Sequence, residues 1–313
     1  MSLLEVKDLK VHYPIRGGFF NKVVDHVYAV DGVDMVVEEG KTYGLIGESG
    51  SGKSTIGKAI IGLEKATSGE VIYKGKNVLD SRVRKELKYN QDVQMIFQDS
   101  MSSLDPKKRV LDILAEPIRN FDNLNEEAEK KRVFELLEIV GMPKDSIYKY
   151  PFEFSGGQRQ RLGVARAIAC KPKLIIADEP VSALDLSVQA QVLNYLKKIQ
   201  KDLNLSYIFI SHDLGVVRHM CDYIYIMHRG RFTETGSRED IYNNPQHIYT
   251  KRLIASIPQI NPKAKEILKE KRELVDKEYE QSYSEYYDKD GKVYTLEKMS
   301  ETHFVAQKKG GNI

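Results

Sequence analysis

The chain has 313 residues, of which 41% are hydrophobic and 30% charged, and its formal net charge is +3. This length allows one large α/β domain with an appendage, and the composition excludes the disordered and membrane-spanning classes. The small positive charge is spread among acidic residues, so by itself it does not predict binding to nucleic acid. We therefore expect a globular protein with a sizeable core.

The first residues show no basic segment followed by an apolar one, so we expect no secretion signal and a cytoplasmic location. Apolar stretches such as residues 174–177 fall far short of the roughly 20 residues that a spanning helix needs. Cys170 and Cys221 are too few for a disulfide framework and are not spaced as metal ligands. We expect both to be reduced packing residues.

The first third of the chain predicts a sheet edge followed by a strand, a loop and a helix. Residues 4–11 and 30–37 alternate apolar and polar positions, which indicates two half-buried antiparallel strands joined near Gly17 and Gly18. Residues 42–46 are typical of a buried strand, and residues 54–63 of the helix that follows.

The rest of the chain predicts an inserted helical part, a return to α/β structure and an extension. Residues 100–150 have a helical pattern within a helical subdomain of about residues 100–165. Helix and strand then alternate, which favours parallel strands with crossover helices: 156–169, 174–177, 187–203, 207–210 and 224–227. From residue 258 the composition shifts to Lys, Glu and Tyr, and we predict an extension with helical and hairpin pieces over 258–313.

One glycine-rich segment lies between the predicted strand and helix: Gly47-Glu48-Ser49-Gly50-Ser51-Gly52-Lys53-Ser54. Glycines let successive backbone amides point at phosphate oxygens, and the helix that follows offers its positive end. The lysine adds a charge on the β and γ phosphates, and the serine hydroxyl a magnesium ligand. The alternative is an ordinary glycine-rich turn. The candidate ATP ligands here are Gly47, Ser49, Gly50, Gly52, Lys53, Ser54 and Thr55.

Two further segments carry nucleotide chemistry. Asp178 and Glu179 end the apolar strand 174–177, where two adjacent carboxylates would repel unless a cation or a reacting water engaged them. Asp178 would hold hydrated magnesium and Glu179 would polarise the attacking water, although an exposed acidic turn before Pro180 is the alternative.

The second of these segments starts a helix: Ser155-Gly156-Gly157-Gln158. Serine is a good N-cap, and the two glycines leave amides uncovered for an anion. Taken alone, this segment is equally consistent with an ordinary helix cap. Beside the other two segments it resembles the signature sequence of ATP-binding-cassette (ABC) proteins, where it caps the γ-phosphate of an ATP bound to the opposite subunit.

This resemblance implies the P-loop NTPase fold of an ABC cassette over residues 1–257 and roles for four more residues. Gln98 matches the glutamine loop that touches magnesium and the water, so the implied metal ligands are Ser54, Gln98 and Asp178. Asp185 matches the dimer-contact loop and His212 the switch histidine. Tyr13 is our choice for the aromatic that stacks on adenine; Phe20, Tyr28 or a plain core role for Tyr13 are the alternatives. The other histidines show no metal spacing and are expected to be ordinary surface or core residues: His12, His26, His219, His228, His247 and His303.

Within that family, residues 3–258 are similar to the ATPases of oligopeptide and dipeptide importers. The matching segments are Ser102 to Pro106, Asp112 to Pro117 with the Ala-Glu-Pro sequence that favours the F-type subunit, Pro245 to Thr250, Ile257-Pro258 and His303 to Ala306. The resemblance implies ATP and Mg²⁺ as cofactors, a second cassette that is a D-type paralogue, two transmembrane permease subunits and an extracellular peptide-binding protein. It places the chain on the cytoplasmic face of the membrane. The cysteine-bearing insertion of many relatives is missing, so no iron–sulfur cluster is expected.

Three alternatives remain at this point. The transported substrate could be a dipeptide, nickel or a sugar. A cassette ATPase that acts on nucleic acid or the ribosome is a second possibility, which the lack of a continuous basic stripe disfavours. A purely structural nucleotide-binding module conflicts with the presence of Glu179 and His212.

Overall fold

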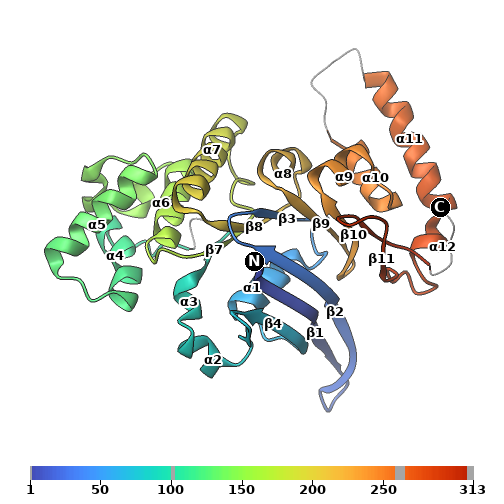
Figure 1. The fold of residues 1–313 in the computed structure, drawn as a ribbon, viewed down its shortest axis with the longest axis horizontal. Helices are drawn as coiled ribbons and strands as arrows, with labels where there is room; N and C mark the ends of the chain where they lie inside the picture. Colours follow the sequence, from blue (N-terminus) through green and yellow to red (C-terminus); the bar gives the residue numbers. More distant parts are fainter. Residues whose placement is uncertain (1, 100–102, 258–264, 309–313) are drawn as a thin grey trace. The chain divides into compact units, whose positions relative to one another are not determined.

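The computed structural model describes residues 2–99, 103–257 and 265–308, which divide into two compact units. The first unit comprises mainly residues 72–210 with the short segment 37–41, and the second comprises residues 5–36, 42–71 and the chain from residue 211 on. Each unit is taken by itself below, and the elements carry the labels of Figure 1. Ser102 and the boundary predicted at residue 258 lie outside the described residues.

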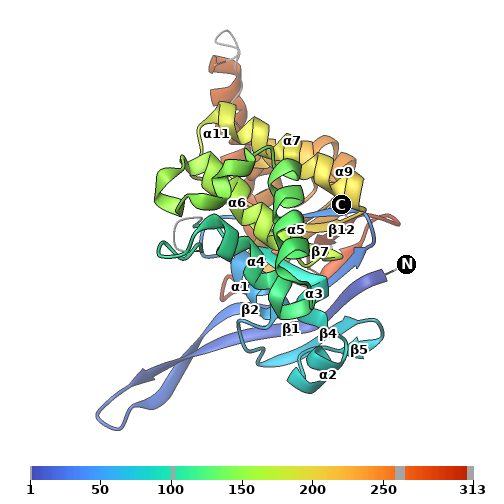
Figure 2. The same cartoon turned by 90° about the vertical axis from the view of Figure 1, so that its left-hand side faces the viewer.

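The second unit begins with a long antiparallel hairpin, drawn in blue in Figure 2. Its strands are β1 (Ser2–Gly17) and β2 (Lys22–Glu38), closed by a turn in which the Asn21 amide donates to the Gly18 carbonyl. Both strands are longer than the predicted 4–11 and 30–37. The additional residues near the turn are largely exposed, so they have no apolar alternation and their pairing was invisible to the pattern.

A sheet carries the remainder of the second unit. Strand β3 (Thr42–Ile46) pairs in parallel with β9 (Tyr223–His228), and β10 (Arg231–Ser237) is antiparallel to β9. Strands β12 (Phe304–Ala306) and β11 (Leu296–Lys298) then add antiparallel to β10. The C-terminal extension therefore continues the sheet, and the hairpin predicted in it is confirmed.

Helices of the second unit follow these strands. They are α1 (Lys53–Ile61), α8 (Leu214–Met220), α9 (Arg238–Asn243), α10 (Ile248–Ala255), α11 (Lys265–Gln281) and α12 (Tyr283–Tyr286). Helix α11 packs on α10, where Lys251 Nζ lies 2.6 Å from Glu278 Oε1 and Arg252 Nε lies 3.0 Å from Asp276 Oδ1. Opposite charges thus join the extension to the helix that precedes it (Figure 1).

The first unit holds parallel strands and the helical part. Strands β6 (Val93–Ile96), β7 (Leu174–Asp178) and β8 (Ser206–Ser211) pair in parallel, and every residue of β7 and β8 is buried. The last two residues of β4 (Ser68–Tyr73) pair with β5 (Lys76–Asn77) in a short hairpin of this unit, while residues 68–71 belong to the second unit. The continuous apolar runs at 174–177 and 207–210 therefore predicted buried parallel strands correctly.

Helices make up most of the remaining first unit: α2 (Ser81–Glu86), α3 (Tyr89–Asp92), α4 (Val110–Phe121), α5 (Glu126–Ile139), α6 (Gly156–Ile168) and α7 (Leu186–Leu203), with 3₁₀ turns at Lys144–Tyr148 and Pro151–Glu153. Asn125 caps α5, and Arg119 of α4 makes two hydrogen bonds of 2.7 and 2.6 Å to the Glu129 carboxylate. The predicted helical subdomain is confirmed in its described part. No helix in the part of the chain that the structure describes is long and apolar enough to cross a membrane.

Candidate functional site

The glycine-rich loop of the second unit joins β3 to α1 and closes around a lysine ammonium. Lys53 is only 4% exposed, and its Nζ donates to the carbonyl oxygens of Gly47 at 2.8 Å and Glu48 at 2.7 Å. These bonds hold the positive charge inside the curve of the loop, at the start of α1. The N-terminal amides of a helix and a fixed cation together form a strong anion site.

Two positions of this loop require glycine because the backbone of another segment passes too close for a side chain. A Cβ on Gly47 would stand 2.1 Å from the carbonyl oxygen of Met227, and one on Gly52 would stand 2.0 Å from that of Ala29. Gly52 also has φ of +108°, which side chains rarely adopt. The loop can therefore keep its shape only with glycine at these two positions.

The three aromatic candidates of the β1–β2 hairpin have different surroundings. Tyr13 is close to the side chains of Glu64 and Thr55, and Thr55 belongs to α1. Burial raises the pKa of Tyr13, and the negative charge of Glu64 raises it further. Phe20 is 79% exposed at the turn, and Tyr28 packs edge-on against the ring of His12. Tyr13 thus lies near the helix that follows the loop, and its contact with adenine stays a prediction.

The carboxylates of the first unit stand at the end of β7. Asp178 is buried, and Glu179 follows with φ of +44°, a conformation that costs energy for a residue other than glycine. The Glu179 amide donates to the Ile210 carbonyl at 3.0 Å, and its own carbonyl accepts from Ser182, which hold this backbone in place. The Gln98 side-chain amide donates to Glu179 Oε2 at 2.8 Å. Two predicted site residues that are 81 positions apart are thus in direct contact.

The start of α6 has the serine N-cap that the sequence predicted. Ser155 Oγ accepts from the Gln158 amide, and Gln158 Oε1 accepts from the Ser155 amide at 2.9 Å, which makes a capping box. The amides of Gly156 and Gly157 belong to the first turn, which has no intrahelical acceptors. Glycine is needed here as well, because a Cβ on Gly157 would stand 2.5 Å from Val188 Cγ1.

Asp185 and His212 occupy loop positions. Asp185 is the N-cap position of α7, is exposed and precedes Leu186, which is 83% exposed. His212 is exposed in the second unit just after β8, and the side chain of Asp213 caps α8 behind it through the amides of Gly215 and Val216. Both residues therefore lie at the start of a helix, and a side-chain cap fixes the turn only in the case of His212.

The donor sets fit a magnesium ion that is held jointly with a nucleotide. Among the described residues, no cluster of three or more His, Cys, Asp or Glu side chains could hold a metal ion alone. Mg²⁺ typically takes one or two protein oxygens, waters and phosphate oxygens. Ser54 in the second unit and Asp178 in the first each carry an oxygen of this kind, and each suits a metal–nucleotide complex better than a dedicated metal cage.

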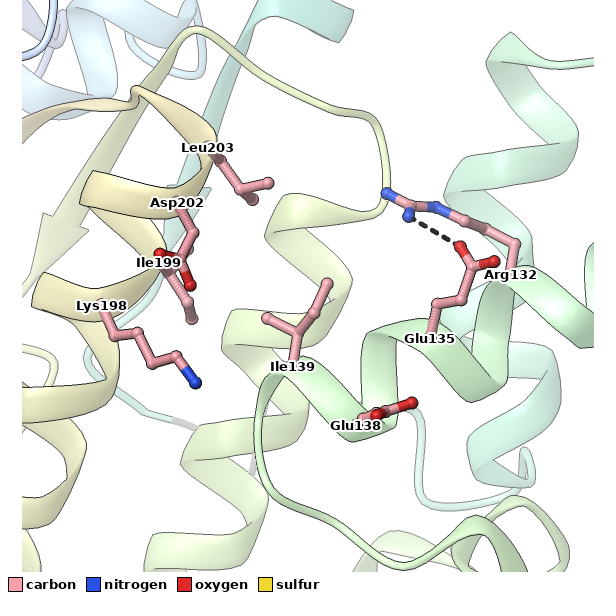
Figure 3. A pocket seen from close by; sticks show the side chains of 8 residues that line it. All are labelled: Arg132, Glu135, Glu138, Ile139, Lys198, Ile199, Asp202 and Leu203. Atoms are coloured by element: carbon pink, nitrogen blue, oxygen red, sulfur yellow. Dashed lines mark hydrogen bonds and ion pairs between the residues drawn. The ribbon is translucent and has the colours of Figure 1, made fainter.

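A cavity of about 420 Å³ lies elsewhere in the first unit, between α5 and α7. Figure 3 shows that Arg132 and Glu135 pair on α5 while Lys198 and Asp202 approach from α7. None of the predicted site residues lines it. The volume of a cavity therefore does not indicate where the nucleotide chemistry of this chain takes place.

Sequence reasoning missed one residue that touches the phosphate loop. The hydroxyl of Tyr249 on α10 accepts a hydrogen bond from the Glu48 amide at 3.1 Å. No periodicity or spacing signals a contact between residues 201 positions apart, although Tyr249 lies in the segment 245–250 that carried the importer resemblance.

Two family models match this chain. Residues 30–182 match the family described as ABC transporter, and residues 233–294 match the oligopeptide/dipeptide transporter C-terminal region. The structure is similar to the dimeric cassette MJ0796 bound to ADP and Pi, with a TM-score of 0.66 and 27% identity over 75% of this chain and 98% of that one. The fold and the three segments define an ATP-binding-cassette ATPase.

Among ABC proteins, the chain is similar to ATP-binding proteins of peptide transport. The oligopeptide transport ATP-binding protein OppF of Lactococcus lactis subsp. lactis (strain IL1403) is 60% identical over 99% of this chain and 97% of that protein. OppF of Bacillus subtilis (strain 168) is 44% identical over 97% of this chain and 95% of that protein. The dipeptide transport ATP-binding protein DppF of Escherichia coli (strain K12) is 44% identical over 83% of this chain and 78% of that protein. The chain belongs to the ABC transporter family.

Proposed function

We propose that this chain is the ATP-hydrolysing subunit of an ABC importer that takes up oligopeptides. The main support for ATP hydrolysis is the hydrogen bond from Gln98 to Glu179 at the end of β7. This bond orients the Glu179 carboxylate next to Asp178. The oligopeptide substrate is supported by the names of relatives that match almost the whole chain and by the C-terminal family region.

In the proposed mechanism, each segment contributes one kind of interaction with ATP. The amides of residues 47–55 and the Lys53 ammonium bind the β and γ phosphates, and Tyr13 stacks on the adenine. Magnesium, when bound with ATP, neutralises phosphate charge, and Ser54, Asp178 and Gln98 would hold it. These roles follow from the chemistry of the side chains and from their match to the family's motifs.

Hydrolysis then depends on orienting a water molecule. Glu179 accepts a proton or a hydrogen bond from the attacking water, and Gln98 limits the rotation of the Glu179 carboxylate through the 2.8 Å bond. His212 donates to the γ-phosphate, where it stabilises charge on the equatorial oxygens. The strained backbone at Glu179 keeps this carboxylate at the strand end and not on a flexible loop.

A second cassette completes the arrangement that we propose. The amides of Gly156 and Gly157, capped by Ser155 and Gln158, receive the γ-phosphate of an ATP held by the loop of the opposite subunit, and Asp185 lies at the contact. The F-type resemblance favours a D-type paralogue as that partner.

The remaining partners are membrane and extracellular components. We propose that two permease subunits bind this chain at the cytoplasmic face of the membrane and that a peptide-binding protein outside the cell delivers the substrate. The helical stretch predicted around Ser100 to Pro117 follows Gln98 closely along the chain, and the structure describes it from residue 103 on. It is the proposed docking site for a short cytoplasmic helix of a permease, through which Gln98 would sense that subunit.

Replacing Glu179 with Gln tests the catalytic proposal. Glu179→Gln keeps the size of the side chain and an oxygen for Gln98 but cannot act as a base, so ATP still binds while turnover falls by about 10²- to 10⁴-fold. Phosphate release by the assembled transporter and binding of a fluorescent ATP analogue measure the two effects. Glu135→Gln, which changes an exposed carboxylate of α5, is the control and keeps normal turnover. Near-normal hydrolysis by the Glu179 variant would reject the assignment.

Dipeptide import is the second candidate because the relatives include DppF proteins at 44% identity. Uptake of labelled peptides of two to six residues by cells that express the transporter distinguishes the two substrates. Oligopeptide import predicts that uptake of longer peptides depends on an intact Lys53, and uptake confined to dipeptides would select the alternative.

A further inference from the structure

The phosphate loop has a contact that the catalytic roles do not use. The Glu48 amide donates to the hydroxyl of Tyr249 at 3.1 Å, and Tyr249 is 1% exposed. An amide has a single hydrogen, so this one is committed to a buried side chain of α10. The bond fixes the orientation of the peptide between Gly47 and Glu48, at the point where β3 turns into the loop.

The turn after β9 supports the same loop from a second direction. The Gly230 amide donates to the Ser51 carbonyl at 3.0 Å. The carbonyl of Met227 lies so close to Gly47 that no Cβ would fit between them. Residues 227–230 and the hydroxyl of Tyr249 therefore contact the phosphate loop from two directions.

The C-terminal extension holds both supports in place. The ring of His228 stacks on that of Tyr249, with centroids 4.2 Å apart and planes 16° apart, and His228 Nδ1 lies 2.9 Å from the Tyr287 hydroxyl. Arg229 donates to the Tyr283 hydroxyl at 2.9 Å and to the Gly291 carbonyl at 2.8 Å. Burial, followed by the charges of Arg229 and Arg252, lowers the pKa of His228 to about 4, so this ring is neutral where it packs.

The same extension reaches β2, and through Asp31 of β2 it connects to His12 on the strand that carries Tyr13. Asp31 Oδ2 accepts from Arg231 Nε at 3.0 Å and lies 2.7 Å from Lys292 Nζ, while Asp31 Oδ1 lies 3.2 Å from His12 Nε2. Burial alone would raise the pKa of Asp31, but the hydrogen bond from Lys292 and the charge of Arg231 outweigh it and hold the value at about 2. Residues 283–293 thus connect to both proposed ATP-contacting segments of this unit.

We infer that the C-terminal extension preorganises the phosphate loop, with Tyr249 as a positioning residue that is held by Tyr287 through His228. This inference rests on the proposed role of the loop in binding ATP. A loop that is already fixed loses less conformational freedom when the nucleotide binds, so its affinity for the nucleotide is higher. Tyr249 acts on the backbone of Glu48, so its loss affects binding of ATP more than the chemical step.

The test is Tyr249→Phe in the assembled transporter. This change keeps the ring that stacks on His228 and removes only the acceptor of the Glu48 amide. From the usual net contribution of one hydrogen bond, KM for ATP rises roughly three- to tenfold. Because Tyr249 has no proposed contact with a reacting atom, kcat stays within about twofold of the wild-type value. Hydrogen exchange of the peptide that contains Glu48 becomes faster.

Tyr223→Phe is the matched control. Its hydroxyl contacts Thr235 at 3.1 Å and the Thr302 carbonyl at 2.9 Å, so this variant loses a contact to the extension at the other end of β9. KM and exchange at Glu48 remain at wild-type values in this control. Tyr287→Phe leaves Tyr249 unchanged but removes the hydroxyl that contacts His228, so KM for ATP also rises. This variant tests the inference if Tyr249→Phe does not assemble into the transporter.

An unchanged KM and unchanged exchange at Glu48 in folded Tyr249→Phe, or equal effects in Tyr223→Phe, would overturn the inference. The proposed function fails separately, through a wild-type chain that does not bind ATP or a Glu179→Gln variant with normal hydrolysis.

Discussion

Glycines at the start of α1 differ sharply in what surrounds them. Gly50 and Gly52 both have positive φ, +79° and +108°. A Cβ on Gly52 would collide with the Ala29 carbonyl and lie 2.7 Å from Met227 Cε, whereas a Cβ on Gly50 would meet no atom within 4 Å. Gly50 is therefore required for its backbone conformation alone. Gly52 is required for its backbone conformation and also because no side chain fits there.

This difference predicts unequal stabilities for two single substitutions. Gly50→Ala loses about 1–2 kcal/mol, the cost of a left-handed conformation for a residue with a side chain. Gly52→Ala has that cost and also moves the β2 backbone at Ala29, so we expect a clearly larger loss. Chemical unfolding of the two variants without nucleotide measures it, and equal stabilities would show that the loop relaxes around the new methyl group.

At the level of single residues, the sequence could predict the loop, the carboxylates and the signature because each is a local pattern with its own chemistry. Tyr249 could not be found this way, since its contact with Glu48 depends on the path of the whole second unit. Tyr13 was chosen from the sequence over Phe20 and Tyr28, and no local pattern shows which of the three lies near α1. The catalytic and binding roles of these residues stay predictions.

Among the elements, the C-terminal tail is attached through one buried carboxylate. Glu234 of β10 is fully buried and accepts from the amides of Gln246 at 2.8 Å and His247 at 3.0 Å. The His303 ring lies 2.7 Å from the same carboxylate, next to β12. A buried charge needs such partners, so the strand, the segment before α10 and the tail stabilise one another.

This cluster predicts a pH-dependent stability. The hydrogen bond to Glu234 raises the pKa of His303, although burial opposes it. A raised pKa in the folded state means that the stabilising effect is complete below the unfolded value of about 6.5 and is lost as the pH rises through the folded value. We expect the free energy of unfolding to fall as the pH rises above 6.5.

His303→Gln should remove this slope, because glutamine can donate to Glu234 but does not titrate. Unfolding in urea at a series of pH values measures the slope, and His26→Gln, at an exposed position of β2, is the control for the loss of one imidazole. A slope that persists in His303→Gln would assign the pH dependence to other groups.

Elements with a strong pattern were predicted and short ones were not. Strands β3, β7 and β8 are continuous apolar runs, and α5 has an asparagine cap followed by three acidic residues in its first turn. Strands β5, β11 and β12 have two or three residues, too few to show a period. The antiparallel β10 was missed because most of its buried residues are polar, among them Thr233, Glu234 and Thr235, so the sequence shows no apolar pattern there.

For the whole molecule, the proposed mechanism divides each ATP site between two chains. In this mechanism the signature turn of this chain contacts the ATP that is bound to the phosphate loop of the partner chain. The phosphate loop with Lys53 binds a different ATP, the one held by this chain. Gly156→Asp separates these two roles. Aspartate suits the first turn of a helix, and a Cβ at Gly156 has only an ordinary contact of 3.6 Å with Leu184 Cδ2, so α6 remains stable.

The added carboxylate would repel a γ-phosphate that is bound across the interface. We expect Gly156→Asp to lower ATP occupancy of the partner chain and hydrolysis by the transporter at least about tenfold, which corresponds to one repulsive contact of about 1.4 kcal/mol or more. ATP occupancy of this chain should fall much less, and the neutral Gly156→Asn should be milder for both. Photocrosslinking of an azido-ATP to each chain separately gives the two occupancies. Loss of label from this chain alone would place the signature turn beside its own nucleotide and contradict the shared site.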